Sequence, residues 1–258
     1  MPDPAPACFE LEQIAMATLD VGRVLTQCGA RAQVARTGCR LVATGLGAEQ
    51  VETRPGFSSI DVTLRRGDDS VTRMGGIGPI GVNHRLDQAV RRLARNVGGM
   101  TPAMLVAEIA RLETETPRHP PWLVAIAVGL ACAAFGKLIG IDWPAVPAVA
   151  AAATIGQYFR HLLLQRSVNV YLVAVIVAFV AASAGAIGAA ALGSSTAYMA
   201  MIAGILLLVP GVPALNAQTD TMEGEPTLGS ARAVSVAMVL IFVVAGVVIA
   251  QAVTGVRQ

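Results

Sequence analysis

Two hydrophobic patterns divide the chain. In the first part, apolar residues alternate with polar ones at short intervals, whereas from Trp122 onward they run together in five long stretches. The stretches cover approximately residues 122–141, 143–164, 168–192, 197–217 and 233–254. Because roughly 20 apolar residues of helix cross the hydrocarbon core of a bilayer, the pattern predicts an all-α, polytopic membrane domain of five transmembrane helices over residues 119–258.

The pattern of residues 1–118 predicts a water-soluble α+β domain. Apolar residues recur at helical spacing over 9–28 and 32–44, and short strands are predicted over 50–54, 58–65 and 70–74. In the middle strand, Ile60, Val62 and Leu64 alternate with polar residues, so one face should be buried. Two further helices follow, one after the candidate cap Asn83 and one after the pair Thr101-Pro102. The predicted order is helix–helix–three strands–helix–helix.

The distribution of charged residues, and of basic residues in particular, predicts the orientation of the chain in the membrane. Residues 1–118 hold 14 of the 19 basic and 13 of the 17 acidic side chains, and the net charge of +2 is too small to favour a nucleic-acid partner. The first 30 residues lack a basic start followed by an apolar core, so the first export signal is predicted near Trp122. Arg160, Arg166 and Arg232 fall in connections on the side of the N-terminus, and Arg257 falls on the other. The positive-inside rule therefore predicts a multi-pass inner-membrane protein with a cytoplasmic N-terminal domain and an outside C-terminus.

The fourth stretch carries the strongest functional signal. Pro210 and Pro213 have no N–H to donate to carbonyls four residues back, and Gly211 loosens the same turn. Backbone groups freed at membrane depth must face protein, water or a ligand, and transporters hold substrates and ions at such breaks. Asn216 and Asp220 follow one and two turns later. We predict that this segment lines a substrate or ion path; a proline kink that only shapes packing is the alternative.

Two other features of the stretches allow two interpretations each. Lys137, which is the only lysine, could lie on the path, or could snorkel to the outer surface or pair with Asp142. Gln157 could lie on the path or bond to another helix. Small residues recur at every fourth position from Ala181 to Gly193, which predicts a close helix–helix contact.

Other functional classes find no support in the sequence. There is no dinucleotide fingerprint, phosphate loop, haem motif or paired metal spacing, and the glycine-rich run 75–81 has no lysine behind it, so it is predicted to be a surface or hinge loop. Cys8, Cys28, Cys39 and Cys132 are predicted to be free thiols. We therefore predict no cofactor, no metal and no enzymatic activity, which leaves ion-coupled secondary transport.

Four segments resemble the threonine/serine exporter family, and within it the short, split branch of the YjjP type. They are Gly22–Gly47, Ser59–Leu64, Ile155–Ala182 and Leu206–Ala233. The resemblance implies a cytoplasmic domain followed by one five-helix half of an exporter. Family positions correspond here to Gly22, Gly29, Gln157, Arg160, Pro210, Gly211, Asn216, Asp220 and Arg232, whereas the family's Gly-Gly before the first outer connection is Gly136-Lys137. The implied substrates are threonine and serine for fused members and succinate-like dicarboxylates for a split pair.

Together these observations predict a subunit of a secondary transporter that exports small polar metabolites with the proton gradient. The predicted path residues are Lys137, Gln157, Arg160, Pro210, Gly211, Pro213, Asn216 and Asp220. Five spans put the two ends of the membrane domain on opposite faces, so a second half would run inverted. The predicted partners are therefore membrane lipid, the metabolite, and a second, smaller membrane subunit or further copies of this chain. The alternative is a membrane-anchored regulatory or scaffold protein whose cytoplasmic domain binds a partner.

Overall fold

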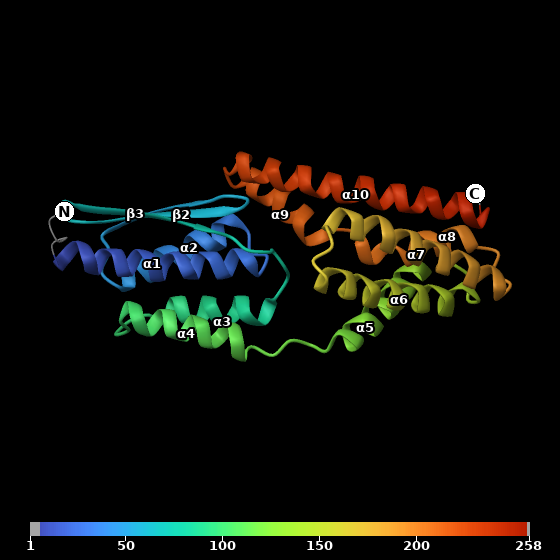
Figure 1. The fold of residues 1–258 in the computed structure, drawn as a ribbon, viewed down its shortest axis with the longest axis horizontal. Helices are drawn as coiled ribbons and strands as arrows, with labels where there is room; N and C mark the ends of the chain where they lie inside the picture. The colour runs from blue at the N-terminus through green and yellow to red at the C-terminus, as the bar shows by residue number, and fades with distance from the viewer. Residues whose placement is uncertain (1–5, 257–258) are drawn as a thin grey trace. The chain divides into compact units, whose positions relative to one another are not determined.

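The computed structural model describes residues 6–256, which form ten α-helices, one short 3₁₀ helix and one small sheet (Figure 1). Contacts divide these residues into two compact units. The first unit combines the residues up to Pro117 with Val212–Ala233, and the second combines Arg118–Gly211 with the residues from Val234 onward. The predicted division into a cytoplasmic domain, 1–118, and a membrane domain, 119–258, stays a prediction. Arg257, used above for orientation, lies outside the described residues.

The first unit has the predicted order of elements. Its elements up to Pro117 are α1 (Pro6–Gln27), α2 (Ala32–Gly45), β1 (Gln50–Pro55), β2 (Ser59–Arg66), β3 (Asp69–Gly76), α3 (His84–Arg95) and α4 (Pro102–Glu115). The three strands form an antiparallel sheet in the order β1-β2-β3, in which Val62 pairs with both Thr53 and Arg73. The prediction of helix–helix–three strands–helix–helix is therefore confirmed.

Helix α1 is the centre of this unit because it buries side chains on two faces. On one face, Leu11 and Ile14 pack in a cluster with Ile60, Val62 and Leu64 of the sheet, all of which are fully or almost fully buried. The expected buried face of the middle strand is thus confirmed.

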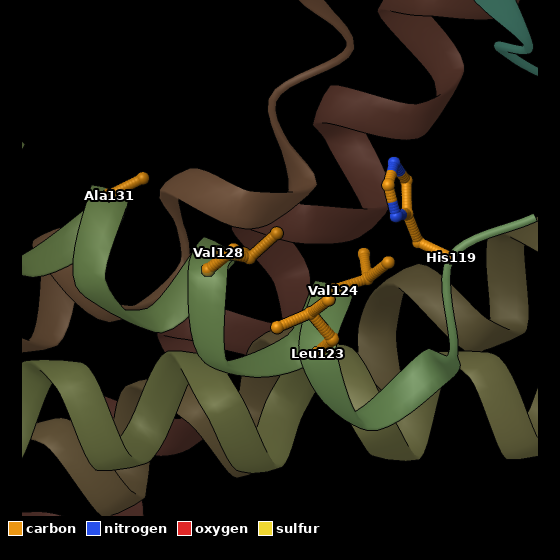
Figure 2. A pocket seen from close by; sticks show the side chains of 6 residues that line it. His119, Leu123, Val124, Val128 and Ala131 are labelled. Atoms are coloured by element: carbon orange, nitrogen blue, oxygen red, sulfur yellow. The ribbon is translucent and has the colours of Figure 1, made fainter. Parts of the chain in front are cut away.

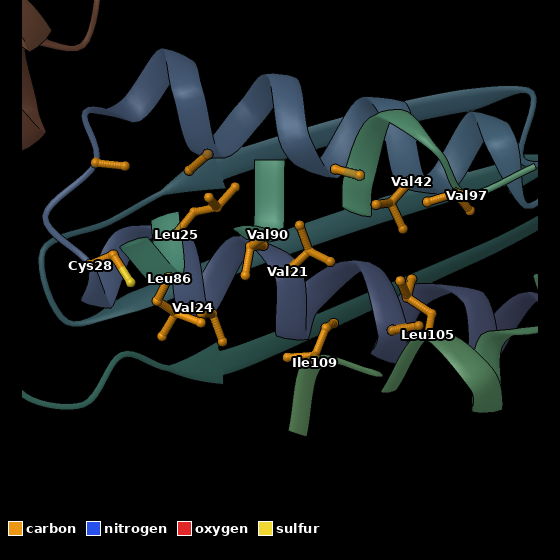
Figure 3. Close-up of a cluster of buried hydrophobic side chains, with 14 residues drawn as sticks. Val21, Val24, Leu25, Cys28, Val42, Leu86, Val90, Val97, Leu105 and Ile109 are labelled. Carbon is orange, nitrogen blue, oxygen red and sulfur yellow. The ribbon is translucent and has the colours of Figure 1, made fainter. Parts of the chain in front are cut away.

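On the other face, Val21 and Val24 of α1 pack with Val90 of α3 and with Leu105 and Ile109 of α4 (Figure 3). The unit therefore consists of a sheet layer, the layer of α1 and α2, and a layer of α3 and α4.

Local signals in the sequence fix the ends of several elements. The Asn83 side chain accepts a hydrogen bond from the Leu86 N–H, and Thr101 accepts one from Met104, so both predicted N-caps are confirmed. The glycine-rich run 75–81 was expected to be irregular throughout, but Gly75 and Gly76 complete β3. A Cβ at Gly75 would lie 2.8 Å from Leu19 Cδ2, so the glycine lets the strand approach α1 closely.

The second unit is entirely helical. It contains α5 (Pro121–Leu138), α6 (Ala145–Gln165), α7 (Val170–Ala191), α8 (Ala197–Gly204) and the 3₁₀ helix η1 (Leu206–Leu208). Two further helices join the units along the chain. All of α9 (Gly211–Met222) after Gly211 belongs to the first unit, and α10 (Pro226–Thr254) begins in the first unit and continues in the second.

Three of the described helices are long and apolar enough to cross a membrane: α5, α7 and α10. A fourth span results if α8 and η1 are counted with α9 as one interrupted helix. The predicted second stretch forms α6, whose length is sufficient but whose last turns carry Gln157, Arg160 and His161 and so lower its mean hydropathy. Five transmembrane helices therefore stay a prediction.

Small residues pack the helices of the second unit together. Ala181, Gly185 and Ala189 of α7 are buried, and a Cβ at Gly185 would lie 2.8 Å from the Ala200 carbonyl oxygen of α8. Gly193 lies just past the end of α7 with a φ of +73°, a conformation that favours glycine. The predicted small-residue stripe is thus a contact inside the bundle.

Candidate functional site

The fourth stretch is interrupted between η1 and α9. Val209 N donates to Leu206 O at 3.2 Å, and Gly211 N donates to Val209 O at 2.9 Å, so the backbone around Pro210 makes short-range bonds in place of the helical ladder. Pro213 lies in the first turn of α9, where backbone N–H groups have no partner within the helix in any case. Pro210 therefore marks the break, whereas Pro213 is compatible with the start of the next helix.

Helix α6 passes close to this break inside the second unit. A Cβ at Gly156 would lie 3.2 Å from Leu207 Cδ2 of η1 and 3.1 Å from Ala181 Cβ of α7. One turn later, Phe159 packs in the cluster that contains Leu208. The C-terminal half of α6 therefore lies beside the residues where the fourth stretch leaves its helical path.

Gln157 and Arg160 each follow directly after one of these packing positions. They are three residues apart on α6, so they are neighbours on the helix surface, and both are partly buried. Within residues 6–256, neither side chain forms a hydrogen bond or an ion pair with the protein. The alternative account of Gln157, a hydrogen bond to another helix, thus finds no partner among the described residues.

A buried ion pair fastens the helical hairpin of α9 and α10 within the first unit. Asp220 of α9 is fully buried and pairs with the guanidinium of Arg232, which is 7% exposed. The second carboxylate oxygen of Asp220 accepts the backbone N–H of Ala32 at 2.9 Å, where α2 begins. Arg232 also donates to the Ala30 carbonyl at 3.3 Å. Both charges therefore have partners in the turn between α1 and α2.

The remaining contacts of the hairpin surround this pair. Asn216 donates from Nδ2 to the carbonyl of Gly29 at 2.8 Å, and Gly29 has a φ of +86°, so the turn depends on glycine there. Nearer the surface, Arg31 pairs with Glu223 at 2.9 Å, and Arg36 pairs with Glu225. We refer to residues 212–233 as the docked hairpin, because polar side chains along its length bind the α1–α2 turn and α2.

A second polar cluster joins two connections of the second unit. Asp142 accepts hydrogen bonds from Ser194 Oγ at 2.6 Å, from Ser195 N at 2.8 Å and from Thr196 Oγ1 at 3.0 Å. The hydrogen bond from Ser194, with those from Ser195 and Thr196, holds the pKa of the Asp142 carboxyl well below its usual range. Asp142 therefore acts as an anionic clamp between the α5–α6 and α7–α8 connections.

Lys137 lies next to this cluster. Its ammonium donates to the Ile141 carbonyl at 2.7 Å and stands 4.6 Å from the centre of the Trp143 ring, a cation–π distance. The predicted alternative of pairing with Asp142 is not found among the described ion pairs.

Features suited to a cofactor are not found in the described residues. No group of three or more His, Cys, Asp or Glu side chains among them could hold a metal ion. Cys28, Cys39 and Cys132 are buried and form no disulfide among the described residues, and the Cys8 side chain lies outside the description. Burial raises the pKa of the Cys39 thiol to about 12. One face of α5, from Leu123 to Ala131, lines an open apolar hollow together with His119 (Figure 2).

Comparison with known proteins decides the family. A family model described as "Putative threonine/serine exporter" matches residues 17–254. The chain belongs to this exporter family. A curated relative, "Probable succinate transporter subunit YjjP" of Klebsiella aerogenes, is 29% identical over 90% of this chain and 91% of its own length. The protein of the same name from Escherichia coli is 37% identical over 54% of this chain and 55% of its own length. No solved structure matches.

The family match includes every residue predicted for the path, but the structure divides them between the two units. Lys137, Gln157, Arg160, Pro210 and Gly211 belong to the second unit, and Pro213, Asn216 and Asp220 belong to the first. Asn216 and Asp220 have their side chains engaged with the α1–α2 turn. Their place on a transport path stays a prediction, as does that of the other six.

The docked hairpin of this exporter-family chain was largely missed by reasoning from the residues. Arg232 entered that reasoning through the membrane orientation and as a family position, but not as the partner of Asp220, although it is the only charged residue within α10. The groups on Gly29, Ala30 and Ala32 that Asn216, Arg232 and Asp220 bind are backbone atoms, which leave no mark in the amino-acid sequence. One signal in the sequence could have predicted the pair. Arg232 is the lone charge near the start of a long apolar helix, and it follows Asp220 by twelve residues.

Proposed function

We propose that this chain is one subunit of a secondary transporter that exports small polar metabolites through a bilayer. Membership of the exporter family over residues 17–254 is the observation that carries this proposal. Both relatives carry the name "Probable succinate transporter subunit", which supports the subunit role and widens the substrate class from threonine and serine to dicarboxylates. The proton gradient is the proposed driving force.

In this proposal the helix break at Pro210 lies at the transport site. Interrupted helices expose backbone groups that can bind polar substrates at membrane depth. The approach of α6 to η1 supports the proposal, because it brings Gln157 and Arg160 to the same region of the second unit. Five spans are proposed from the five apolar stretches. The cytoplasmic location of the N-terminal domain and the outside C-terminus are proposed from the distribution of arginine.

The docked hairpin gives the cytoplasmic domain a proposed role. Its residues continue directly from the break at one end and into α10 at the other. Asp220, Asn216 and Arg232 fasten it to the α1–α2 turn, so the domain and the broken helix are tied together by contacts and by chain connectivity. We propose that the domain holds the hairpin in the conformation that transport requires.

Replacing Pro210 with alanine should impair export while the protein still inserts into the membrane. Alanine supplies an N–H that can donate to a carbonyl one turn back and so favours a continuous helix across the break. The measurement is the export rate of the variant relative to the wild type at equal amounts in the membrane. Pro147→Ala is the matched control, because Pro147 lies in the first turn of α6, where the added N–H needs no helical partner. Equal export rates of the wild type and Pro210→Ala would show that the helix break is not needed for transport.

An export assay in cells distinguishes this proposal from the scaffold alternative. Cells that express this chain together with a second membrane subunit of the family should release threonine, serine or succinate faster than cells lacking either protein. Collapse of the proton gradient with an uncoupler should abolish the difference. Unchanged release of all three metabolites, together with stable binding of a cytoplasmic protein to the N-terminal domain, would favour the scaffold.

A further inference from the structure

Arg160 differs from every comparable arginine in the chain. Among residues 6–256, seven arginines are at least partly buried. Six of them form ion pairs with carboxylates: Arg23, Arg36, Arg66, Arg73, Arg91 and Arg232. Arg160 alone of the seven has no carboxylate and no hydrogen-bond partner within the described residues. The chain therefore supplies an anion to each of the other buried guanidinium groups, but not to this one.

We infer that Arg160, assisted by Gln157, binds a carboxylate group of the exported metabolite. This inference rests on the proposed function, since it names the chemical group that the transport site recognises. A cation within an apolar helix is costly unless it is paired, and such residues commonly mark substrate pathways. A substrate carboxylate would supply the missing partner. Arg160 would then be a specificity-determining residue of the transporter.

The geometry of the two side chains suits a carboxylate. A guanidinium presents a planar fork of N–H donors that can bind both carboxylate oxygens, and charge-assisted bonds of this kind are stronger than bonds between neutral groups. The Gln157 amide carries two more donors and lies one turn away on the same helix face. Neighbouring Gly156 and Phe159 pack against η1. Apolar walls of this kind lower the local dielectric constant and strengthen the attraction.

The chemistry of the named metabolites agrees with this assignment. The description of the family names threonine and serine, and the name of the relatives contains succinate. The chemical group that all three metabolites share is a carboxylate that is ionised at neutral pH. Amines and hydroxyls are present in only two of the three. A site that accepts both amino acids and dicarboxylates needs a cation for the common group, and Arg160 is the cation on α6 beside the helix break.

The alternative is that Arg160 only snorkels toward the membrane surface. Arg166, the C-cap residue of the same helix, provides the matched control because it is an exposed arginine six residues further along. Snorkelling predicts that neither arginine affects substrate affinity. Carboxylate binding predicts that Arg160 does and Arg166 does not.

The first test measures binding in detergent by the increase in thermal stability that each ligand causes. Succinate, threonine and serine are titrated against the wild-type complex of this chain with its second subunit, and succinamide and threoninamide serve as ligands without the carboxylate. We expect the acids to bind and the amides to bind far more weakly. Arg160→Gln should weaken binding of the acids roughly 10- to 100-fold, as expected for loss of a charged hydrogen bond. Arg160→Lys should recover part of the affinity, and Arg166→Gln should match the wild type.

The second measurement is flux of the same ligands through vesicles. The loss of affinity in Arg160→Gln should appear as a higher KM for transport. The elution volume and the melting temperature of the unliganded complex should equal those of the wild type, which shows that the variant is folded. Wild-type affinity in Arg160→Gln, or equal binding of acids and amides by the wild type, would overturn the inference even if transport occurs. Binding that depends on Arg160 without any flux would instead overturn the proposed transport function and leave Arg160 as a carboxylate-binding residue.

Discussion

Replacing Asp220 with asparagine is expected to destabilise the docked hairpin by about 3–5 kcal/mol, because it leaves the buried Arg232 guanidinium without its counter-charge. The amide keeps the size of the carboxylate, and its oxygen can still accept the Ala32 N–H. Its NH2 group then faces the Arg232 guanidinium, so the change removes both the charge and the acceptor of the ion pair. The same unit contains a matched control. Arg31 and Glu223 form an ion pair at the surface, 45% and 31% exposed, and Glu223→Gln should cost at most about 1 kcal/mol.

Hydrogen exchange of the backbone amides provides the measurement. In Asp220→Asn, exchange should become faster in residues 212–233 and at the start of α2, whereas Glu223→Gln should leave both segments protected. The double variant Asp220→Asn/Arg232→Gln should lose less stability than the sum of the two single changes. Each single change leaves the other member of the pair as an unpaired buried charge, whereas the double change leaves no charge there. Equal protection in all variants would mean that the ion pair does not hold the hairpin.

The second large effect is expected at Gly246, where α10 packs against α7 in the second unit. A Cβ at this position would lie 2.5 Å from the Val175 carbonyl oxygen and 2.8 Å from Ala178 Cβ, so no side chain fits without separating the helices. Gly246→Leu should therefore destabilise the bundle by about 1–3 kcal/mol or more. Thermal unfolding in detergent measures the loss.

The neighbouring residue provides the control for this change. Ala245 is exposed on the same helix, so Ala245→Leu adds a similar side chain to a surface without neighbours and should leave the melting temperature unchanged. Equal melting temperatures for Gly246→Leu and the wild type would contradict the close contact between α7 and α10.

Much of the first unit could be predicted because its signals are local. The alternation of Ile60, Val62 and Leu64 predicts a strand with one buried face, and Asn83 and Thr101 predict helix starts through bonds to residues three positions away. Such signals depend on nearby residues alone. They can therefore be recognised in the sequence without knowledge of the fold.

The arrangement around the fourth stretch could not be predicted in the same way. Asp220 and Asn216 are polar residues near a proline break, and the pattern alone favours a path through the membrane. Besides the Asp220–Arg232 ion pair, their partners are backbone atoms of Gly29 and Ala32, almost two hundred residues earlier in the chain. Bonds between a side chain and a distant backbone group follow from the folded geometry and have no counterpart in periodicity or spacing.

The clamp at Asp142 was missed for a related reason. Ser194, Ser195 and Thr196 lie in a short connection without lysine or arginine, so the charge pattern gives no sign of a partner for Asp142. Three adjacent hydroxyl side chains can satisfy a carboxylate as a basic residue does, but only when two connections meet in space. The sequence contained the donors, and the fold determined their acceptor.

Flux through vesicles that hold this chain and its second membrane subunit, singly and together, tests the two-subunit exporter most directly. Vesicles loaded with labelled threonine, serine or succinate should release at least one of them in response to a proton gradient when both chains are present. Each chain alone should release none above the rate of protein-free vesicles. Full release by this chain alone would contradict the need for a second subunit, and no release of any of the three by the pair would contradict the exporter itself.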